Sequence, residues 1–252
     1  MTLAHEIAGD GPAVVLLHSS VCDRRMWDPQ WRLLTDAGFR VMRPDFRGYG
    51  ETPAPASAYD EARDILRLLD HYGIERAALI GSSFGGRVAQ EFAARWPSRV
   101  TRLLLVCPAS RLVEPTDDLR AFGAEEDALL EAGDIGGAVA LNVRTWLGPA
   151  AGESTRELVS RMQRHAFEVQ LAAPDVAAVR DDFDLREISA LTLVLSGAHD
   201  LDGMQGVAVF LAEHIDGAVH ERLDWAGHLP SVEDPARFNP VLVDFLDDLR
   251  DP

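Results

Sequence analysis

The chain has 252 residues, of which 24 are basic and 41 acidic, so its formal net charge at pH 7 is −17. All 24 basic residues are arginine, which excludes a lysine Schiff base and a phosphate-binding P-loop with its lysine. The acidic balance argues against nucleic acid or an anionic membrane surface as a partner, because both are bound by cationic patches. Hydrophobic residues form 47% of the chain, enough for the core of one enlarged domain or of two domains.

The cysteines and the length of the apolar runs indicate in which cellular compartment the protein is found. The two cysteines, Cys22 and Cys107, lie far apart in the sequence and are predicted to be buried, reduced thiols. No stretch approaches the roughly 18 consecutive apolar residues that a membrane-spanning helix needs. Residues 1–10 lack a basic start followed by a long apolar run, so we expect no signal peptide. Together these features predict a cytoplasmic protein.

Six short runs rich in Val, Leu and Ile recur along the chain, and helical patterns separate them. Continuous apolarity is typical of strands that are buried on both faces, as in a parallel sheet covered by helices. The predicted strands are Val14–His18, Phe39–Asp45, Ala77–Ser83, Val100–Cys107, Leu191–Gly197 and Ala218–Leu223. Helices are predicted over Tyr59–Tyr72, Phe84–Trp96 and Gln205–His214. The alternation of strand and helix predicts an α/β fold.

One long segment, residues 111–184, carries an acidic, alanine-rich helical pattern and no convincing strand. Within it, Ser154 and Glu157 are spaced as a capping box, which predicts a helix that begins there and continues through Gln170. We therefore predict that a helical insertion over 111–184 interrupts a core domain made of residues 1–110 and 185–252.

The last predicted helix contains a proline and ends in acidic residues. Asn239–Pro240 is expected to interrupt or restart this helix, because proline lacks an N–H and clashes with the preceding turn. The acidic end, Asp244–Asp251, is predicted to be a solvated helix face.

The strongest local signal is the segment Gly81-Ser82-Ser83-Phe84-Gly85-Gly86, which lies between a predicted strand and a predicted helix. It matches the G-x-S-x-G pattern, in which the serine sits on a sharp turn in a strained backbone conformation. Glycine two residues before and two after the serine lets the strand and the helix approach each other. The turn holds the Ser83 hydroxyl at the N-terminus of the helix, where free N–H groups favour developing negative charge. Ser82 is the competing hydroxyl, but the spacing centres on Ser83.

A nucleophilic serine needs a base, and the base needs a group that orients it. His228 lies in a turn between the last predicted strand and the last helix, which makes it the candidate base among eight histidines. Asp200 comes just after the fifth predicted strand, at the carboxyl end where open α/β sheets bind ligands. Asp202 could replace Asp200, and His199 could be mistaken for the base. The chain order Ser83, Asp200, His228 is the order expected of Ser-His-Asp hydrolases built on an α/β sheet.

Acyl transfer also develops an oxyanion, which backbone N–H groups stabilise. The N–H of Phe84 is one candidate donor because it follows the serine. The second donor should come from the loop after the first predicted strand, which reads His18-Ser19-Ser20. Ser20 is the preferred donor, and Ser19 is the alternative.

These segments resemble the α/β-hydrolase superfamily, and the resemblance covers nearly the whole chain except the insertion. The matching stretches are Leu17-His18, Asp45-Phe46-Arg47-Gly48-Tyr49-Gly50, Gly81 to Gly86, Gly197 to Asp200, and Gly227-His228 followed by Glu233, Pro235 and Phe238. The resemblance implies a mostly parallel sheet flanked by helices, with a helical cap inserted between strands six and seven. Residues 23–30 are also similar to a segment of bacterial 3-oxoadipate enol-lactonases. Ser19 departs from the pattern, since most members of the superfamily have glycine there.

The motifs and the resemblance together predict a serine hydrolase that cleaves a small carboxylic ester or lactone through an acyl-enzyme, without a cofactor or a metal. Ser83 would attack the carbonyl, His228 would transfer the proton, and Asp200 would orient His228. Carbon–carbon bond hydrolysis or peracid formation on the same three residues stays open, as does a non-catalytic protein that binds a ligand. The expected partner is a small-molecule substrate, with neither nucleic acid nor membrane, and the sequence leaves the oligomeric state open.

Other side chains are weaker candidates for substrate contact. Some follow the oxyanion loop and could line the acyl pocket, and others could face the site from the insertion: Ser19, Cys22, Met26, Trp27, Trp146, Met162 and Phe167. Arginine suits bidentate contact with a substrate carboxylate, for which the candidates are Arg24, Arg144 and Arg164. For each of these residues the alternative is a plain structural role, in core packing or on the surface.

Overall fold

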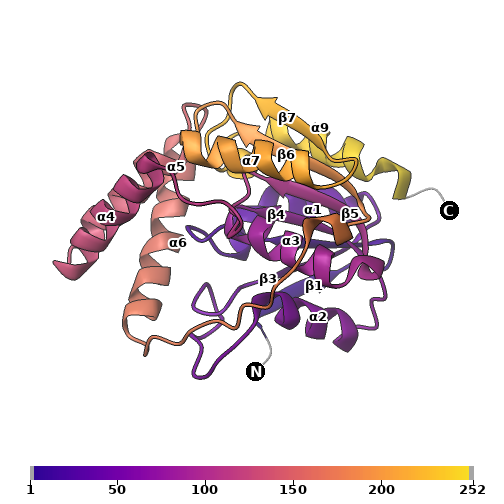
Figure 1. The fold of residues 1–252 in the computed structure, drawn as a ribbon, viewed down its shortest axis with the longest axis horizontal. Helices are drawn as coiled ribbons and strands as arrows, with labels where there is room; N and C mark the ends of the chain where they lie inside the picture. Colours follow the sequence, from indigo (N-terminus) through magenta and orange to yellow (C-terminus); the bar gives the residue numbers. More distant parts are fainter. Residues whose placement is uncertain (1–2, 250–252) are drawn as a thin grey trace.

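The computed structural model describes residues 3–249, built around a seven-stranded sheet with the order β1-β3-β2-β4-β5-β6-β7 (Figure 1). β1 pairs antiparallel with β3, and the other neighbouring pairs are parallel. The bounds are β1 (His5–Ala8), β2 (Ala13–Leu17), β3 (Arg40–Pro44), β4 (Ala77–Ser82), β5 (Val100–Val106), β6 (Leu191–Gly197) and β7 (Val219–Leu223). β2 to β7 confirm the six predicted strands. β1 was not predicted, because this short edge strand has no buried residue and therefore no apolar run.

Helices cover both faces of the sheet, which explains the continuous apolar runs. The core helices are α1 (Asp28–Asp36), α2 (Glu61–His71), α3 (Phe84–Arg95), α7 (Asp202–His214), α8 (Pro230–Glu233) and α9 (Pro235–Leu246). In β4, Ala77 and Leu79 belong to the hydrophobic cluster under α2, α3 and α7, whereas Ala78 and Ile80 belong to the cluster under α1 and α9. Successive side chains of one strand therefore pack in different layers, and each fully buried aliphatic chain contributes about 1.5–3 kcal/mol.

The predicted break in the last helix is wrong, because α9 continues through Pro240. Phe238, Leu242 and Leu246 recur every four residues and are fully buried, so the packing of this face outweighs one missing hydrogen bond. Pro240 itself lies on the exposed side of the helix. α9 ends at Leu246 and a short 3-10 turn follows. The acidic side chains at 244, 247 and 248 are exposed as predicted, while positions 250–252 lie outside the described residues.

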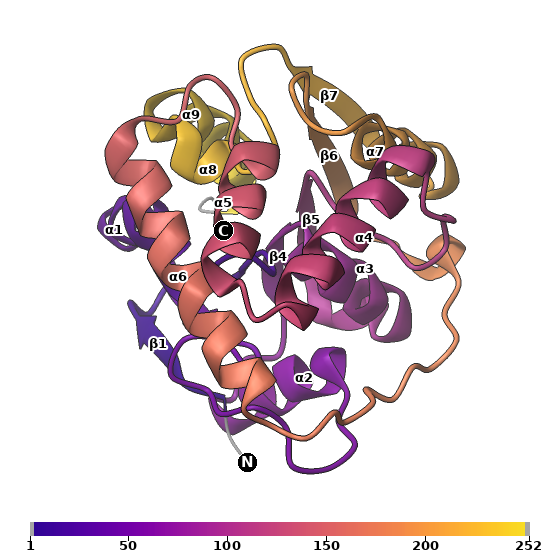
Figure 2. The same ribbon diagram turned by 90° about the vertical axis from the view of Figure 1, so that its left-hand side faces the viewer.

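Residues 111–184, all of them described, contain three helices and no strand: α4 (Asp117–Glu131), α5 (Ile135–Trp146) and α6 (Glu153–Leu171). Figure 2 shows these helices lying together in front of the sheet. They follow β5 and precede β6, so the insertion lies between the fifth and sixth strands and not between the sixth and seventh, since one strand fewer precedes it than the resemblance implied. The predicted capping box is also wrong. α6 begins at Glu153 with Gly152 as its N-cap, and Ser154 lies inside the first turn.

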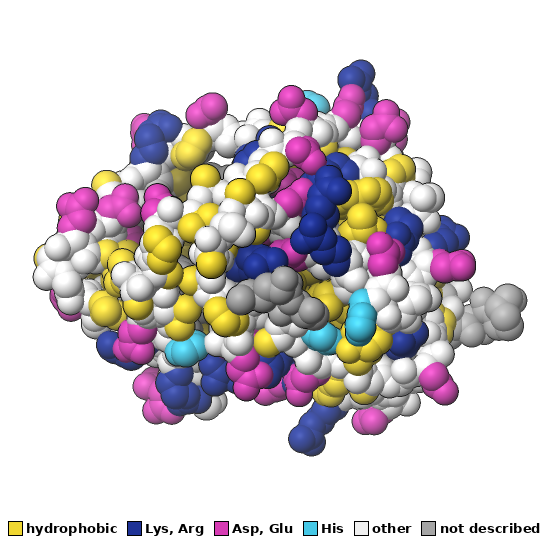
Figure 3. Space-filling view, turned by 90° about the horizontal axis from the view of Figure 1, so that it is seen from below, with side chains coloured by type: hydrophobic (Ala, Val, Ile, Leu, Met, Phe, Trp, Pro, Cys, Tyr) yellow, Lys and Arg dark blue, Asp and Glu magenta, His cyan; other side chains and the backbone are white. Residues whose placement is uncertain are grey.

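The distribution of charged side chains on the surface and the burial of the two cysteines can be compared with what the composition predicts. Figure 3 shows arginine and acidic side chains interspersed over one face of the molecule, without a large patch of one sign. Cys22 and Cys107 are buried and free, as predicted. Within residues 3–249, no helix combines the length and the apolarity needed to cross a bilayer.

Candidate active site

Ser83 occupies a strained turn between β4 and α3. Its backbone angles are φ 52° and ψ −111°, and it shares a positive φ with Cys107 alone among the non-glycine residues described. Such a conformation costs of order 1–3 kcal/mol and persists only where the surrounding structure enforces it. The Ser83 N–H donates to the Val106 carbonyl, and the Ser83 carbonyl accepts from Ala109, so the turn is bonded to the end of the neighbouring strand β5.

Three glycines permit this turn, the two that the motif predicts and Gly86. A Cβ atom on Gly81 would lie 2.4 Å from the carbonyl oxygen of Gly85, and one on Gly85 would lie 2.3 Å from the carbonyl oxygen of Leu17. A Cβ on Gly86 would approach the Pro108 side chain to 2.9 Å. No Cβ fits at these distances without a shift of its neighbours, so the start of α3 can approach β4, the end of β2 and Pro108 because glycine occupies all three positions.

The two serines of the motif differ in environment. Ser82 is the last residue of β4, is fully buried, and its hydroxyl has no partner among the described residues. Ser83 keeps 6% of its surface exposed and stands at the N-terminus of α3. The geometry therefore favours Ser83 over Ser82 as a group that a substrate can reach.

Asp200 and His228 form a buried pair at the carboxyl edge of the sheet. His228 Nδ1 lies 2.6 Å from Asp200 Oδ2, and the side chains of both residues are almost completely buried. Asp200 Oδ1 accepts the N–H of Leu201 at 2.8 Å, which fixes the carboxylate. With its Nδ1 proton donated to Asp200, the neutral imidazole presents Nε2 as an acceptor. The alternatives Asp202 and His199 are both exposed, and neither takes part in this pair.

The pair lies beside the Ser83 turn, although no hydrogen bond joins the Ser83 hydroxyl to His228 within residues 3–249. The sulfur of Cys107, a carboxylate oxygen of Asp200 and a ring nitrogen of His228 lie within 4.8 Å of one another. Cys107 falls between Val106 and Ala109, the two residues that bond the backbone of Ser83. Hydrogen bonds between nucleophile and base are often long in ligand-free enzymes and shorten when substrate binds.

The turn that carries His228 is clamped from two sides. Glu233 accepts the N–H of Gly227 at 2.7 Å and the N–H of Leu229 at 2.9 Å, so one carboxylate holds both neighbours of the base. Burial raises the pKa of Glu233, and the N–H groups lower it in part. From the insertion, the Trp146 carbonyl accepts the N–H of His228 at 3.0 Å, and the two rings pack with centroids 4.5 Å apart.

The loop after β2 leaves one peptide N–H, that of Ser20, without an acceptor among the described residues. The Ser19 carbonyl accepts from Cys22 N–H at 3.1 Å and lies 2.8 Å from His18 Nδ1, while the N–H of Phe46 donates to His18 Nε2. Burial lowers the pKa of His18, in agreement with the neutral ring that this pattern requires. In a trans peptide the Ser20 N–H points away from the Ser19 carbonyl, and it has no acceptor among the residues described.

The N–H groups of Ser20 and Phe84, the two preferred oxyanion donors, differ from that of Ser19, the alternative donor. The N–H of Ser19 is directed at Met26 Sδ, 3.3 Å away, and is not free. The N–H of Phe84, in the first turn of α3, has no acceptor in the described chain, as expected at a helix N-terminus. Ser20 and Phe84 therefore have N–H groups without an acceptor in the described chain, and their role in binding an oxyanion stays a prediction.

The weaker candidates lie in different environments. Met26 and Trp27 are fully buried, and the Trp27 ring packs near Phe238, 6.4 Å between centroids. Trp146 contacts His228 directly, and its indole N–H donates to Asn142 Oδ1 at 2.9 Å. Contact of these side chains with a substrate stays a prediction. Phe84 also lines a cavity of about 470 Å³, together with aromatic and polar groups that include Phe46, Tyr49, Tyr59, Gln170 and Arg180.

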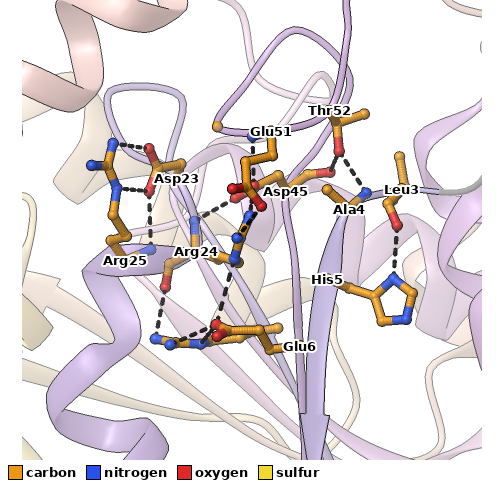
Figure 4. Close-up of polar contacts among 12 residues, drawn as sticks. Leu3, Ala4, His5, Glu6, Asp23, Arg24, Arg25, Asp45, Glu51 and Thr52 are labelled. Carbon is orange, nitrogen blue, oxygen red and sulfur yellow. Dashed lines mark hydrogen bonds and ion pairs between the residues drawn. The ribbon is translucent and has the colours of Figure 1, made fainter.

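Arg24 is engaged within the protein (Figure 4). Its guanidinium is paired with Asp45, Glu51 and Glu6, and its backbone N–H donates to Asp45 Oδ1 at 2.8 Å. Asp45 is fully buried, so this network joins the loop after β3 to the segment after the oxyanion loop. Arg144 is likewise paired, with Glu125 on α4. Sequence reasoning missed the clamp by Glu233, although Glu233 follows the histidine by five positions in a stretch that carries the family resemblance.

Comparison with known proteins agrees with this architecture. The model of the alpha/beta hydrolase family matches residues 14–241. A putative carbamate hydrolase of Variovorax paradoxus is 32% identical over 98% of this chain and 96% of its own, and 3-oxoadipate enol-lactonase 2 of Acinetobacter baylyi is 29% identical over 91% and 86%. Among solved structures, a hydrolase from Pseudomonas aeruginosa superposes with a TM-score of 0.79 at 31% identity, covering 97% of this chain and 94% of its own. The enol-lactonase from Burkholderia xenovorans superposes with a TM-score of 0.78 at 28% identity, covering 97% and 96%. The chain belongs to the α/β-hydrolase family, and it is a hydrolase.

Proposed function

We propose that this hydrolase cleaves small carboxylic esters or lactones through an acyl-enzyme on Ser83, with His228 as the base and Asp200 as its orienting carboxylate. The observation that carries the proposal is the buried hydrogen bond of 2.6 Å between His228 and Asp200 beside the strained turn of Ser83. A residue held at positive φ next to a buried imidazole–carboxylate pair is costly to maintain, and nucleophilic catalysis accounts for the cost.

The proposed reaction begins when His228 Nε2 takes the Ser83 proton as the hydroxyl oxygen attacks the substrate carbonyl. The oxyanion binds to the N–H groups of Ser20 and Phe84. His228 then protonates the leaving alcohol or enol oxygen, the carbonyl re-forms, and the acyl group stays on Ser83. Water, deprotonated by His228, releases the acid and regenerates the serine. Asp200 keeps the Nδ1 proton in place and stabilises the imidazolium in both steps.

We further propose that the insertion, residues 111–184, is a cap that closes over the substrate. Trp146 supports this role because it contacts His228 by backbone and by ring. The names of the relatives, a carbamate hydrolase and an enol-lactonase, describe carbonyl substrates whose leaving group bonds through nitrogen or oxygen. We therefore include carbamates beside esters and lactones in the substrates to be assayed.

The decisive experiment is active-site labelling with a fluorophosphonate, followed by mass spectrometry of the modified peptide. We expect modification of Ser83 in the native protein, and none in Ser83→Ala. The matched control is Ser82→Ala, which removes the neighbouring buried hydroxyl and should keep the labelling. Hydrolysis of p-nitrophenyl acetate should fall by at least about 10⁴-fold in Ser83→Ala. Labelling that persists in Ser83→Ala, or none in the native protein, would refute the proposal.

The alternatives give different results in the same assays. A carbon–carbon bond hydrolase would label at Ser83 but turn over a ring-fission diketone and leave esters, lactones and carbamates intact. A perhydrolase would require hydrogen peroxide as the acceptor of the acyl group. A ligand-binding member of the fold would not label at all, because a receptor needs no activated serine.

A further inference from the structure

Cys107 is a buried thiol beside the candidate site, and the proposed mechanism does not use it. It follows β5 with φ 43°, it is fully buried, and its Sγ lies 3.6 Å from the carbonyl oxygen of Gly227. Gly227 is the residue before His228, so the sulfur lies against the turn that carries the base.

The sulfur also belongs to a compact set of three different donor atoms. Sγ of Cys107, a carboxylate oxygen of Asp200 and a ring nitrogen of His228 lie within 4.8 Å of one another, and all three residues are buried. Around a tetrahedral Zn²⁺, with bonds of about 2.0–2.3 Å, ligand atoms are separated by about 3.3–3.6 Å. To reach these separations, His228 Nδ1 and Asp200 Oδ2, now 2.6 Å apart, must move apart by about 1 Å, and the sulfur must approach by at most about 1.5 Å.

We propose that Cys107, Asp200 and His228 form an inhibitory site for a thiophilic divalent cation such as Zn²⁺ or Cd²⁺. A thiolate, an imidazole and a carboxylate are a donor set that these ions bind, whereas Mg²⁺ and Ca²⁺ prefer oxygen ligands alone. The carbonyl oxygen of Gly227 lies near enough to the sulfur to supply a fourth ligand.

The site would inhibit without any contact with Ser83. The nitrogen that faces Asp200 is Nδ1, so the ion takes the place of the Nδ1 proton. The imidazole stays neutral, with its proton now on Nε2, and the Cys107 thiol proton passes to solvent as the sulfur–metal bond forms. No oxidation is involved. An Nε2 that carries a proton cannot accept the proton of Ser83, so the nucleophile loses its base.

The test compares two matched variants, because the chain has two buried cysteines and only Cys107 lies in this set. Cd²⁺ is titrated into the native protein, Cys107→Ala and Cys22→Ala, and the ultraviolet absorbance of the cadmium–thiolate bond is recorded. Ester hydrolysis is measured in parallel, relative to the uninhibited rate of each protein. Mg²⁺ serves as the oxygen-seeking control, and EDTA should reverse the effect.

We expect absorbance and inhibition in the native protein and in Cys22→Ala, and at least a tenfold higher inhibitory concentration in Cys107→Ala. Where Cys107→Ala does not fold, Cys107→Ser keeps the size of the side chain and replaces the sulfur. Equal sensitivity of the Cys107 variants and the native protein would overturn the proposal, as would the absence of a cadmium–thiolate band from the native protein.

The activity readout rests on the proposed function, but the absorbance readout does not. A protein that binds Cd²⁺ through Cys107 yet shows no fluorophosphonate labelling would retain the metal site and lose the hydrolase mechanism. A protein that labels at Ser83, with labelling and absorbance both unaffected by Cd²⁺, would retain the mechanism and lose the metal site.

Discussion

Replacing Glu233 with glutamine should loosen the turn that carries the base. The carboxylate of Glu233 gives one oxygen to the N–H of Gly227 and the other to the N–H of Leu229. Glutamine keeps a single acceptor oxygen, so its NH₂ group must face one of these N–H donors. The loss is one hydrogen bond to a charged group, about 1.5–3 kcal/mol, and a buried donor is left without a partner. Burial raises the pKa of Glu233, so removal of the charge recovers part of this loss.

We therefore expect Glu233→Gln to lower the free energy of unfolding by about 1–3 kcal/mol, with Tm falling by about 2–4 °C per kcal/mol. Because the affected residues flank His228, kcat should fall at least tenfold while KM changes little. Thermal unfolding and steady-state ester hydrolysis measure the two effects. The control is Glu221→Gln, since Glu221 is exposed on β7 and should tolerate the change. A variant with native Tm and kcat would refute the clamp.

Three further changes test other contacts. In α7, Gly203→Ala places a Cβ 2.1 Å from Thr116 Oγ1 and should lower Tm. In the same helix, the Cβ of Gly206→Ala meets nothing within 4 Å, so this variant should raise the free energy of unfolding by about 0.5–1 kcal/mol. Thermal unfolding of the two variants compares the effects. Burial lowers the pKa of His18, so its contribution to stability is full above about pH 6.5 and is lost as the pH falls below that value. His18→Asn should flatten this part of a plot of Tm against pH, and an unchanged slope would count against it. Trp146→Phe keeps a ring against His228 and should retain more activity than Trp146→Ala in the ester assay, whereas equal activities would show that the ring is not needed.

The fold could be predicted largely because burial leaves a strong pattern in sequence. Strands such as β4 are covered on both faces and therefore form uninterrupted apolar runs. β1 could not be found in this way, because it is short, lies at the edge of the sheet and has no buried residue. The start of α6 was misplaced because Ser154 fits a capping pattern, yet Gly152 in an extended conformation already begins the helix. Local patterns leave such boundaries open by a few residues.

The parts of the candidate site that could be predicted are those whose residues occur at fixed spacings in the sequence. The glycines around Ser83 are required by contacts with backbone atoms, so they appear in the sequence as a motif. Asp200 and His228 could be selected because each follows a strand at the same edge of the sheet. Trp146 was among the side chains that could face the site, but its contact with His228 could not be predicted, since it depends on how the insertion packs on the core. The role of Glu233 was hidden for a different reason, because its partners are the backbone N–H groups of Gly227 and Leu229, which carry no sequence signal.

The insertion contacts the core directly at the base and at the residue before it. The Trp146 carbonyl bonds the N–H of His228, and the backbones of Gly148 and Gly227 approach so closely that a Cβ on Gly148 would lie 2.4 Å from the Gly227 nitrogen. Movement of this end of the insertion would therefore displace His228. α4 is different, because none of its 15 residues is buried. Phe122 of α4 nevertheless packs on the Trp146 ring, with centroids 4.6 Å apart, and the Trp146 ring packs on His228. We therefore expect a displacement of α4 to reach the base through Trp146, at a lower free-energy cost than a displacement of the buried parts of the insertion.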